Sequence, residues 1–170
     1  MATFPGNTLE AMSVAGNLKL IARDKEDLAV LSAALQDALV RVGNITYLPK
    51  RRRFAAVVNR FAWETTSPDK AHKKDVKNRS RLFQRVRTGI HFDGVLSVKS
   101  HNVIQDRQDA VLCLLAIEFD GKDDGSGEVT LVFGGGGAIR LEVECLDVVL
   151  DDLGLTWVTT KKPQHEVFDE

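Results

Sequence analysis

The sequence predicts an α+β protein with a mostly antiparallel sheet, or a partly closed barrel, of about seven or eight strands. Three observations support this prediction. Apolar residues recur at helical spacing over residues 25–41, and again over residues 146–153. Between them lie short runs rich in β-branched and aromatic residues, separated by turn-forming residues. We therefore expect one N-terminal helix, a sheet and one short C-terminal helix.

The composition is that of a soluble domain. The chain has 170 residues, of which 28% are charged and 44% hydrophobic, close to average soluble usage. The longest apolar run, residues 110–117, is shorter than the ~20 residues a membrane span needs, and the start lacks a signal-peptide pattern. We expect a cytoplasmic protein with a flexible arm at residues 1–17, one domain at residues 18–158 and a tail at residues 159–170.

The first elements are a strand and a helix. Residues 18–22 form a short apolar run that predicts a strand. Asp24 suits a helix N-cap, and Glu26 and Asp27 suit the first turn because carboxylates stabilise the positive end of the helix dipole. A helical stripe then ends at Gly43 and comprises Leu28, Leu31, Leu35, Ala38, Leu39 and Val42. These positions predict a helix over residues 25–41.

The middle of the chain predicts two hairpins and a central strand. Residues 44–49 and 53–63 flank a basic turn and form the first hairpin. The polar residues 65–80 predict a long loop. Residues 81–92 and 95–103 meet at Asp93-Gly94 and form the second hairpin. Residues 110–119 are apolar on both sides of the alternation, which indicates a central, doubly covered strand.

The four glycines of FGGGGAIR, residues 133–140, raise the question of a phosphate-binding loop. Such a loop leads into a helix whose first amides hold the anion. Here Ile139, Leu141 and Val143 alternate with polar residues, so the glycines lead into a strand. The segment therefore predicts a tight hairpin turn, in which glycine supplies positive φ. After this strand, Leu146, Val149, Leu150 and Leu153 predict the short C-terminal helix, closed by Gly154.

Four segments of the chain match a known family in order: residues 18–43, 52–64, 89–98 and 134–154. Over about residues 18–155 the chain resembles a family of small bacterial proteins that is catalogued only as a domain of unknown function. The resemblance implies no activity, cofactor or catalytic residue. The predicted strand count and final helix are also similar to the plan of pleckstrin-homology domains, with an open α+β sheet and two packed helices as the alternative.

Charge is divided unevenly along the chain. Residues 1–49 carry 4 Lys and Arg and 5 Asp and Glu, residues 50–107 carry 15 and 5, and residues 108–170 carry 4 and 14. Opposite charges on facing strands can neutralise each other. Alternatively, the cations form one anion-binding patch on a rim of the sheet. The patch candidates are Lys50, Arg51, Arg52, Arg53, Lys70, Lys73, Lys74, Lys77, Arg79 and Arg81.

The leading hypothesis from these observations is a non-catalytic binding domain whose basic rim contacts an acidic protein partner. A homodimer that pairs basic and acidic surfaces is a further possibility. Nucleic acid or an anionic headgroup is the second candidate ligand, with stacking faces supplied by nearby aromatic residues. These aromatic residues are Phe54, Phe61, Trp63, Phe83 and Phe92.

The rival hypothesis is an enzyme or a metal-binding protein that uses His91, Asp93 and His101. His91 and Asp93 share one side of a strand, and His101 lies on the next predicted strand. We find no catalytic or metal-ligand motif in the sequence and expect no cofactor. Cys113 and Cys145 both lie in apolar runs, which predicts two buried free thiols.

Overall fold

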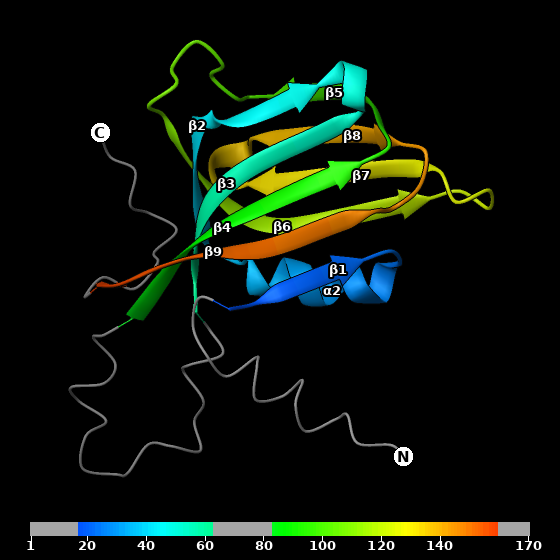
Figure 1. Cartoon of the computed structure of the whole chain (residues 1–170). Helices are drawn as coiled ribbons and strands as arrows, with labels where there is room; N and C mark the ends of the chain where they lie inside the picture. The colour runs from blue at the N-terminus through cyan, green and yellow to red at the C-terminus, as the bar shows by residue number, and fades with distance from the viewer. Residues whose placement is uncertain (1–16, 63–82, 160–170) are drawn as a thin grey trace, which may run out of the picture.

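The computed structural model describes residues 17–62 and 83–159, which form one sheet and one α-helix (Figure 1). The helix is α2, Lys25–Ala34. The strands are β1 (Lys19–Ala22), β2 (Ala38–Leu48), β3 (Arg53–Phe61), β4 (Phe83–Asp93), β5 (Val95–His101), β6 (Val111–Gly121), β7 (Gly127–Phe133), β8 (Ala138–Val143) and β9 (Val148–Thr159). Two short 3-10 turns, η1 (Pro49–Arg51) and η4 (Gly134–Gly136), join strands. The predicted arm and tail lie almost entirely outside the described residues.

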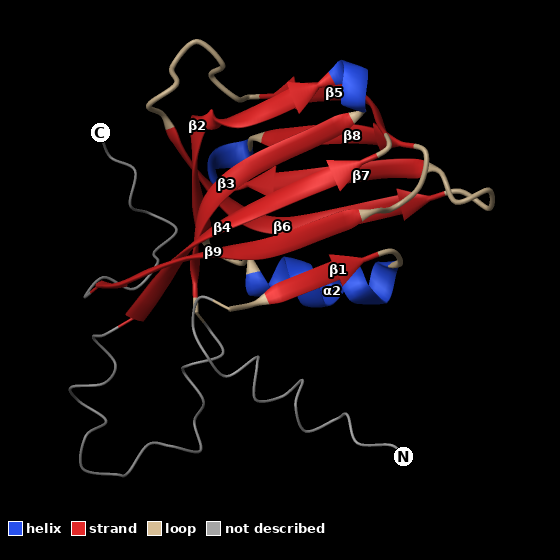
Figure 2. Ribbon diagram, viewed as in Figure 1, coloured by secondary structure: helices blue, strands red, loops and turns tan. Residues whose placement is uncertain are grey.

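All neighbouring strands pair antiparallel, in the order β1-β9-β4-β3-β2-β6-β7-β8-β5 (Figure 2). The end strands β1 and β5 do not pair with each other, so the described sheet is open. Strand β2 joins two parts of it: only its first residues pair with β6, and its register to β3 shifts between Val40 and Ile45. We call β1, β9, β4, β3 and β2 the first half-sheet, and β6, β7, β8 and β5 the second half-sheet.

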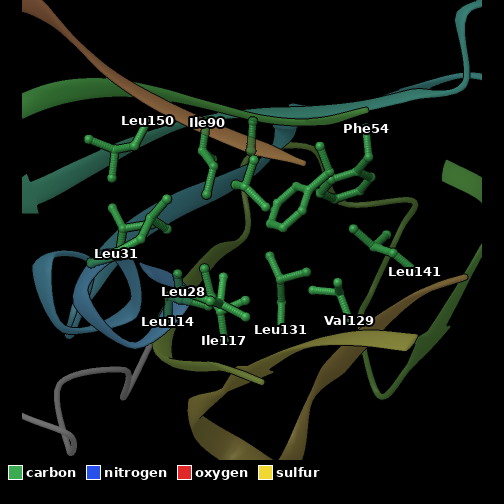
Figure 3. Close-up of a cluster of buried hydrophobic side chains, with 14 of the residues drawn as sticks. Leu28, Leu31, Phe54, Ile90, Leu114, Ile117, Val129, Leu131, Leu141 and Leu150 are labelled. Atoms are coloured by element: carbon green, nitrogen blue, oxygen red, sulfur yellow. The ribbon is translucent and has the colours of Figure 1, made fainter. Parts of the chain in front are cut away.

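The core lies between the two half-sheets. Phe54, Ile90 and Leu150 of the first half-sheet point toward Leu131 and Leu141 of the second (Figure 3). Helix α2 packs against β1 and β6 and adds a further pair of leucines to this cluster, Leu28 and Leu31. Burial of such side chains is the main favourable term in folding, at about 25 cal/mol per Å² of apolar surface removed from water.

Helix α2 begins where the sequence predicts but ends earlier. The Asp24 carboxylate accepts a hydrogen bond from the Asp27 amide at 2.8 Å, which confirms the N-cap. The prediction that the helix runs to residue 41 is wrong, because Asp37 turns the chain at φ 63° and residues 38–48 form β2. The apolar residues of this segment satisfy both periods, and pairing with β3 and β6 decides in favour of the strand.

The predicted C-terminal helix is wrong, because residues 148–159 form β9. Val148, Leu150 and Asp152 alternate inward, and β9 pairs with β1 on one side and β4 on the other. Hydrogen bonding on both sides outweighs the helical spacing of its leucines. The predicted fold class is therefore also wrong. The described residues form nine strands with a single α-helix, not an α+β fold of seven or eight strands with two helices, and they lack the final helix of the pleckstrin-homology plan.

Two of the three predicted hairpins are present in the structure. The β2–β3 hairpin is confirmed, and so is the glycine turn, where Gly135 and Gly136 have φ of 79° and 85° between paired β7 and β8. The β4–β5 hairpin is wrong, because β4 pairs with β3 and β9 whereas β5 pairs with β8. Gly94, at φ 73°, carries the chain from the first half-sheet to the second. The central position of β6, between β2 and β7, is confirmed, but the strand is not covered along its whole length, because Val111 and Glu118 are exposed.

Candidate binding surface

The outward face of the first half-sheet contains a trough of about 470 Å³. Strand register explains its position, because one row across the sheet runs from Lys19 to Asp151, Gly89 and Val57. The next row includes His91 and Ala55. The residues that line the trough are Lys19, Asn44, Thr46, Arg53, Ala55, Ala56, Val57, Gly89, Ile90, His91, Val149, Asp151 and Leu153.

Gly89 leaves the floor of the trough without a side chain. Its φ lies outside the positive region that favours glycine. A Cβ built there would come no closer than 3.8 Å to the Asp151 carbonyl oxygen and to Leu153 Cδ2, which is ordinary contact. Neither backbone conformation nor crowding therefore demands glycine at this position. A glycine inside a strand often marks a place where a ligand or another backbone approaches closely.

A carboxylate holds two basic side chains at the end of the trough nearest the β2–β3 turn. Arg53 donates from Nε to Asp93 Oδ1 at 2.8 Å and from Nη2 to Oδ2 at 3.3 Å. His91 Nε2 lies 3.5 Å from Asp93 Oδ2. The hydrogen bonds from Arg53 to Asp93 raise the pKa of Arg53, so the guanidinium stays charged. Arg53 and His91 line the trough, whereas Asp93 does not.

The predicted basic turn is η1 and the residues that follow it. Arg52 adopts φ 50° and pairs with Glu144, while Arg53 pairs with Asp93. Lys50 and Arg51 are exposed and form no ion pair within the described residues. The structure thus separates the four consecutive cations into two that are paired and two that are available. The other patch candidates, Lys70, Lys73, Lys74, Lys77, Arg79 and Arg81, lie outside the described residues.

The predicted trio of His91, Asp93 and His101 does not come together. His91 and Asp93 are close on β4, but His101 ends β5, which pairs with β8 in the second half-sheet. From Val95, beside Asp93, the strand extends six residues to His101, or roughly 20 Å at ~3.3 Å per residue. Within residues 17–62 and 83–159, no three His, Cys, Asp or Glu side chains form a group that could hold a metal ion.

The aromatic residues proposed as stacking faces are mostly core residues. Phe54, Phe61 and Phe92 are each 1% exposed, and the rings of Phe54 and Phe92 pack edge to face at 6.0 Å. Trp63 and the Phe83 side chain lie outside the described residues. Phe54, Phe61 and Phe92 therefore offer no stacking platform to a nucleic acid base.

Sequence reasoning missed a buried ion pair on the inward face of the first half-sheet. Arg60 donates to Asp152 Oδ1 and Oδ2 at 2.8 and 2.6 Å, and both side chains are 0% exposed. Asp152 also accepts from Thr88 Oγ1 at 2.7 Å and from the Leu18 amide at 2.9 Å. Burial alone would raise the pKa of Asp152, but the hydrogen bonds from Arg60 and Thr88 hold it below its usual value. The sequence held one signal for Arg60: it occupies the same alternate positions of β3 as Phe54, Ala56 and Val58, which point into the core.

A second unpredicted group lies near the start of β4. Arg85 packs over the Phe61 ring, 3.9 Å from its centroid, and burial lowers the pKa of its guanidinium.

The two cysteines differ in exposure. Cys113 is buried, and burial raises the pKa of its thiol. The prediction of two buried cysteines is correct for Cys113 and wrong for Cys145, which is exposed. Cys145 lies two residues after Val143, the last residue of β8.

The second half-sheet has its own outward hollow, of about 410 Å³. Two contacts link polar side chains of its lining: Arg140 Nε lies 3.9 Å from Glu128 Oε1, and Ser97 Oγ donates to Glu142 at 3.0 Å. Part of the basic middle of the chain is likewise neutralised by the acidic end, through Arg52–Glu144 and Arg60–Asp152. Local pairing therefore accounts for several of the cations, and Lys50 and Arg51 are the exposed exception in the basic turn.

Comparison with known proteins identifies the family. Residues 18–165 match the model of a family described as "Protein of unknown function (DUF2948)", so the chain belongs to that family. No curated protein and no solved structure matches the chain. In the described part of the chain, no helix is long and apolar enough to cross a membrane.

Proposed function

We propose that this member of the DUF2948 family is a binding domain that contacts an acidic protein partner through Lys50 and Arg51. One observation supports the proposal above the others. Lys50 and Arg51 are exposed without a carboxylate partner among the described residues, although carboxylates hold the next two cations. The turn therefore offers two unpaired positive charges beside two that are fixed in place.

The backbone of the turn holds these cations in a defined position. Pro49 begins η1, and the Arg52 amide donates to the Pro49 carbonyl at 3.1 Å. The Arg52 carbonyl in turn accepts from the Val95 amide at 2.8 Å, which ties the turn to β5. Because the backbone of the turn is already ordered, binding costs this segment less conformational entropy than it would cost a flexible one.

The expected strength of this contact is modest. An exposed ion pair contributes about 0.2–1 kcal/mol, so two pairs together change the affinity roughly 2- to 30-fold. Raising the salt concentration from about 50 to about 500 mM should weaken this contact strongly. The Debye length shortens over this range, so added salt screens the attraction between exposed charges.

The test uses fluorescence anisotropy with labelled poly-L-glutamate as the acidic probe. The double variant Lys50→Ser/Arg51→Ser should bind the probe several-fold more weakly than the parent chain, with a shallower dependence on salt. The matched control is Lys99→Ser/Lys122→Ser, which removes two cations from the hollow of the second half-sheet and should leave binding unchanged. Equal binding by the parent and the Lys50/Arg51 variant would refute the proposal.

The same variants distinguish the alternative ligands. Duplex DNA and vesicles containing phosphatidylserine are titrated in parallel with the acidic peptide. Tighter binding of either one, lost in the Lys50/Arg51 variant, would replace the acidic protein with nucleic acid or an anionic headgroup as the ligand. The fold gives no added support to catalysis, because His101 is separated from His91 and Asp93.

A further inference from the structure

We infer that the trough on the first half-sheet is a binding site for a planar aromatic carboxylate. The ring would lie over Gly89, Val57 and Ala55, and the carboxylate would meet Arg53 and His91. This site is separate from Lys50 and Arg51, which do not line the trough. Its existence therefore does not depend on the proposed contact with an acidic partner.

The shape of the floor favours a flat apolar group. Gly89 has no side chain, and its neighbour across β3 is Val57, with Ala55 in the next row. All three residues are partly exposed on the outward face, so a ring can reach them without rearrangement of the backbone. Aromatic rings remove a large apolar area from water for little conformational entropy, which suits a shallow and rigid floor.

The basic end of the trough favours an anionic group on that ring. Asp93 occupies Nε and Nη2 of Arg53, and Nη1 forms no hydrogen bond within the described residues. Arg53 thus presents a free pair of N–H donors while its carboxylate partner holds the guanidinium from outside the lining. Donors that are already oriented bind a carboxylate at a lower entropic cost than a free arginine does.

The dimensions of the site suit a small ligand. Gly89 and His91 are two residues apart along β4, which corresponds to roughly 7 Å at ~3.3 Å per residue. Two fused rings with one carboxylate span this distance. The other end of the trough carries Lys19 and Asp151 as direct cross-strand neighbours of opposite charge.

The test is an NMR titration of the full chain with 2-naphthoate as the probe and 2-naphthylmethanol as the uncharged analogue. We expect saturable shifts of the Gly89, Val57 and Ala55 amides with a Kd on the order of 1 mM, from the usual ligand efficiency of small molecules. The alcohol should bind several-fold more weakly. The absence of saturable shifts at these amides for naphthoate would overturn the inference.

Two sets of variants test the ring and the carboxylate separately. Gly89→Leu should abolish binding of both probes, since it fills the floor, and the fold should tolerate it because the Cβ position is uncrowded. The matched control Thr130→Leu places the same side chain on the outward face of β7 and should bind both probes normally. Unchanged thermal unfolding of Gly89→Leu shows that it is folded. If it is not, Gly89→Val is measured in its place.

The carboxylate contact is tested with Arg53→Met/Asp93→Asn, which removes the guanidinium without leaving an unpaired carboxylate. Naphthoate should then bind only as well as the alcohol, whose own affinity should stay the same. If this double variant binds naphthoate like the parent chain, the assignment of the anionic end is wrong. Lys50→Ser/Arg51→Ser should bind naphthoate normally, so a failure of the proposed function would leave this result unaffected.

Discussion

Strand β3 carries the arginines of two arginine–aspartate pairs, whose aspartates lie on β4 and β9 and whose surroundings differ. Arg60 and Asp152 are 0% exposed on the inward face, whereas Arg53 and Asp93 are 40% and 32% exposed on the outward face. In both pairs Nε and Nη2 of the arginine contact the two carboxylate oxygens. The same two residue types therefore form a buried pair on one face and a partly exposed pair on the other.

The inward pair differs from the outward pair because it has further partners and no access to water. Asp152 accepts from Arg60, Thr88 and the Leu18 amide, and Arg60 also donates to the Phe61 carbonyl at 3.0 Å. These contacts connect β3, β4 and β9 with the start of β1. A buried ion pair contributes little compared with an apolar replacement, but removal of one partner leaves a buried charge uncompensated.

The largest expected effect comes from breaking the inward pair on one side. Asp152→Asn leaves the Arg60 guanidinium buried and should lower the free energy of unfolding by about 3–5 kcal/mol. Urea unfolding, with the midpoint and slope fitted together, measures this change.

A rescue variant distinguishes charge burial from lost packing. Arg60→Met/Asp152→Leu removes both charges and keeps apolar volume, so it should be clearly more stable than Asp152→Asn. If the double variant is less stable than the single variant, the penalty is not due to removal of the Asp152 carboxylate from the buried pair.

The pH dependence of stability tests the inward pair further. The pKa of Asp152 is lower in the folded chain than its unfolded value of about 3.9, so its contribution to stability is present above that value. The contribution is lost as the pH falls through the folded pKa. We expect the free energy of unfolding to decrease on acidification below about pH 5. Arg53 adds nothing to this slope, because its raised pKa keeps it charged over the whole range.

Urea unfolding at a series of pH values between about 7 and 3 measures this dependence. The Arg60→Met/Asp152→Leu variant should show a smaller loss of stability on acidification than the parent chain. An identical dependence in the two proteins would mean that other carboxylates cause the acid sensitivity.

Part of the fold was predictable because local chemistry determines it. The Asp24 N-cap, the β2–β3 hairpin and the glycine turn depend on residues close together in the sequence. Strand β9 was not predictable in the same way, because Leu146, Val149, Leu150 and Leu153 fit a helix while Val148, Leu150 and Asp152 fit a strand. Pairing with β1 and β4, which are distant in sequence, selects the strand.

The candidate surfaces differ in the same respect. The basic turn is continuous in sequence, so charge alone identified Lys50 and Arg51. The trough brings together Gly89, Val57 and Asp151, which become neighbours only through the order of β3, β4 and β9. Alternation along β3 could have indicated the inward position of Arg60, which sequence reasoning missed, and assignment of residues 146–153 to a helix concealed its partner Asp152.

The smallest expected effect on stability comes from breaking the outward pair. Asp93→Asn should change the free energy of unfolding by less than about 1 kcal/mol, because exposed ion pairs contribute little. It should nevertheless weaken naphthoate binding several-fold, since Arg53 then loses the carboxylate that orients its guanidinium. Urea unfolding and the NMR titration measure the two effects on one sample.

Glu128→Gln is the control, because it removes another solvent-accessible carboxylate, which lies 3.9 Å from Arg140 in the second half-sheet. It should leave both stability and naphthoate binding nearly unchanged. A loss of stability for Asp93→Asn as large as that of Asp152→Asn would mean that the outward pair also holds the sheet together. In that case both pairs would stabilise the fold despite their different exposure. The orientation of Arg53 would then serve the fold and would not indicate a binding site.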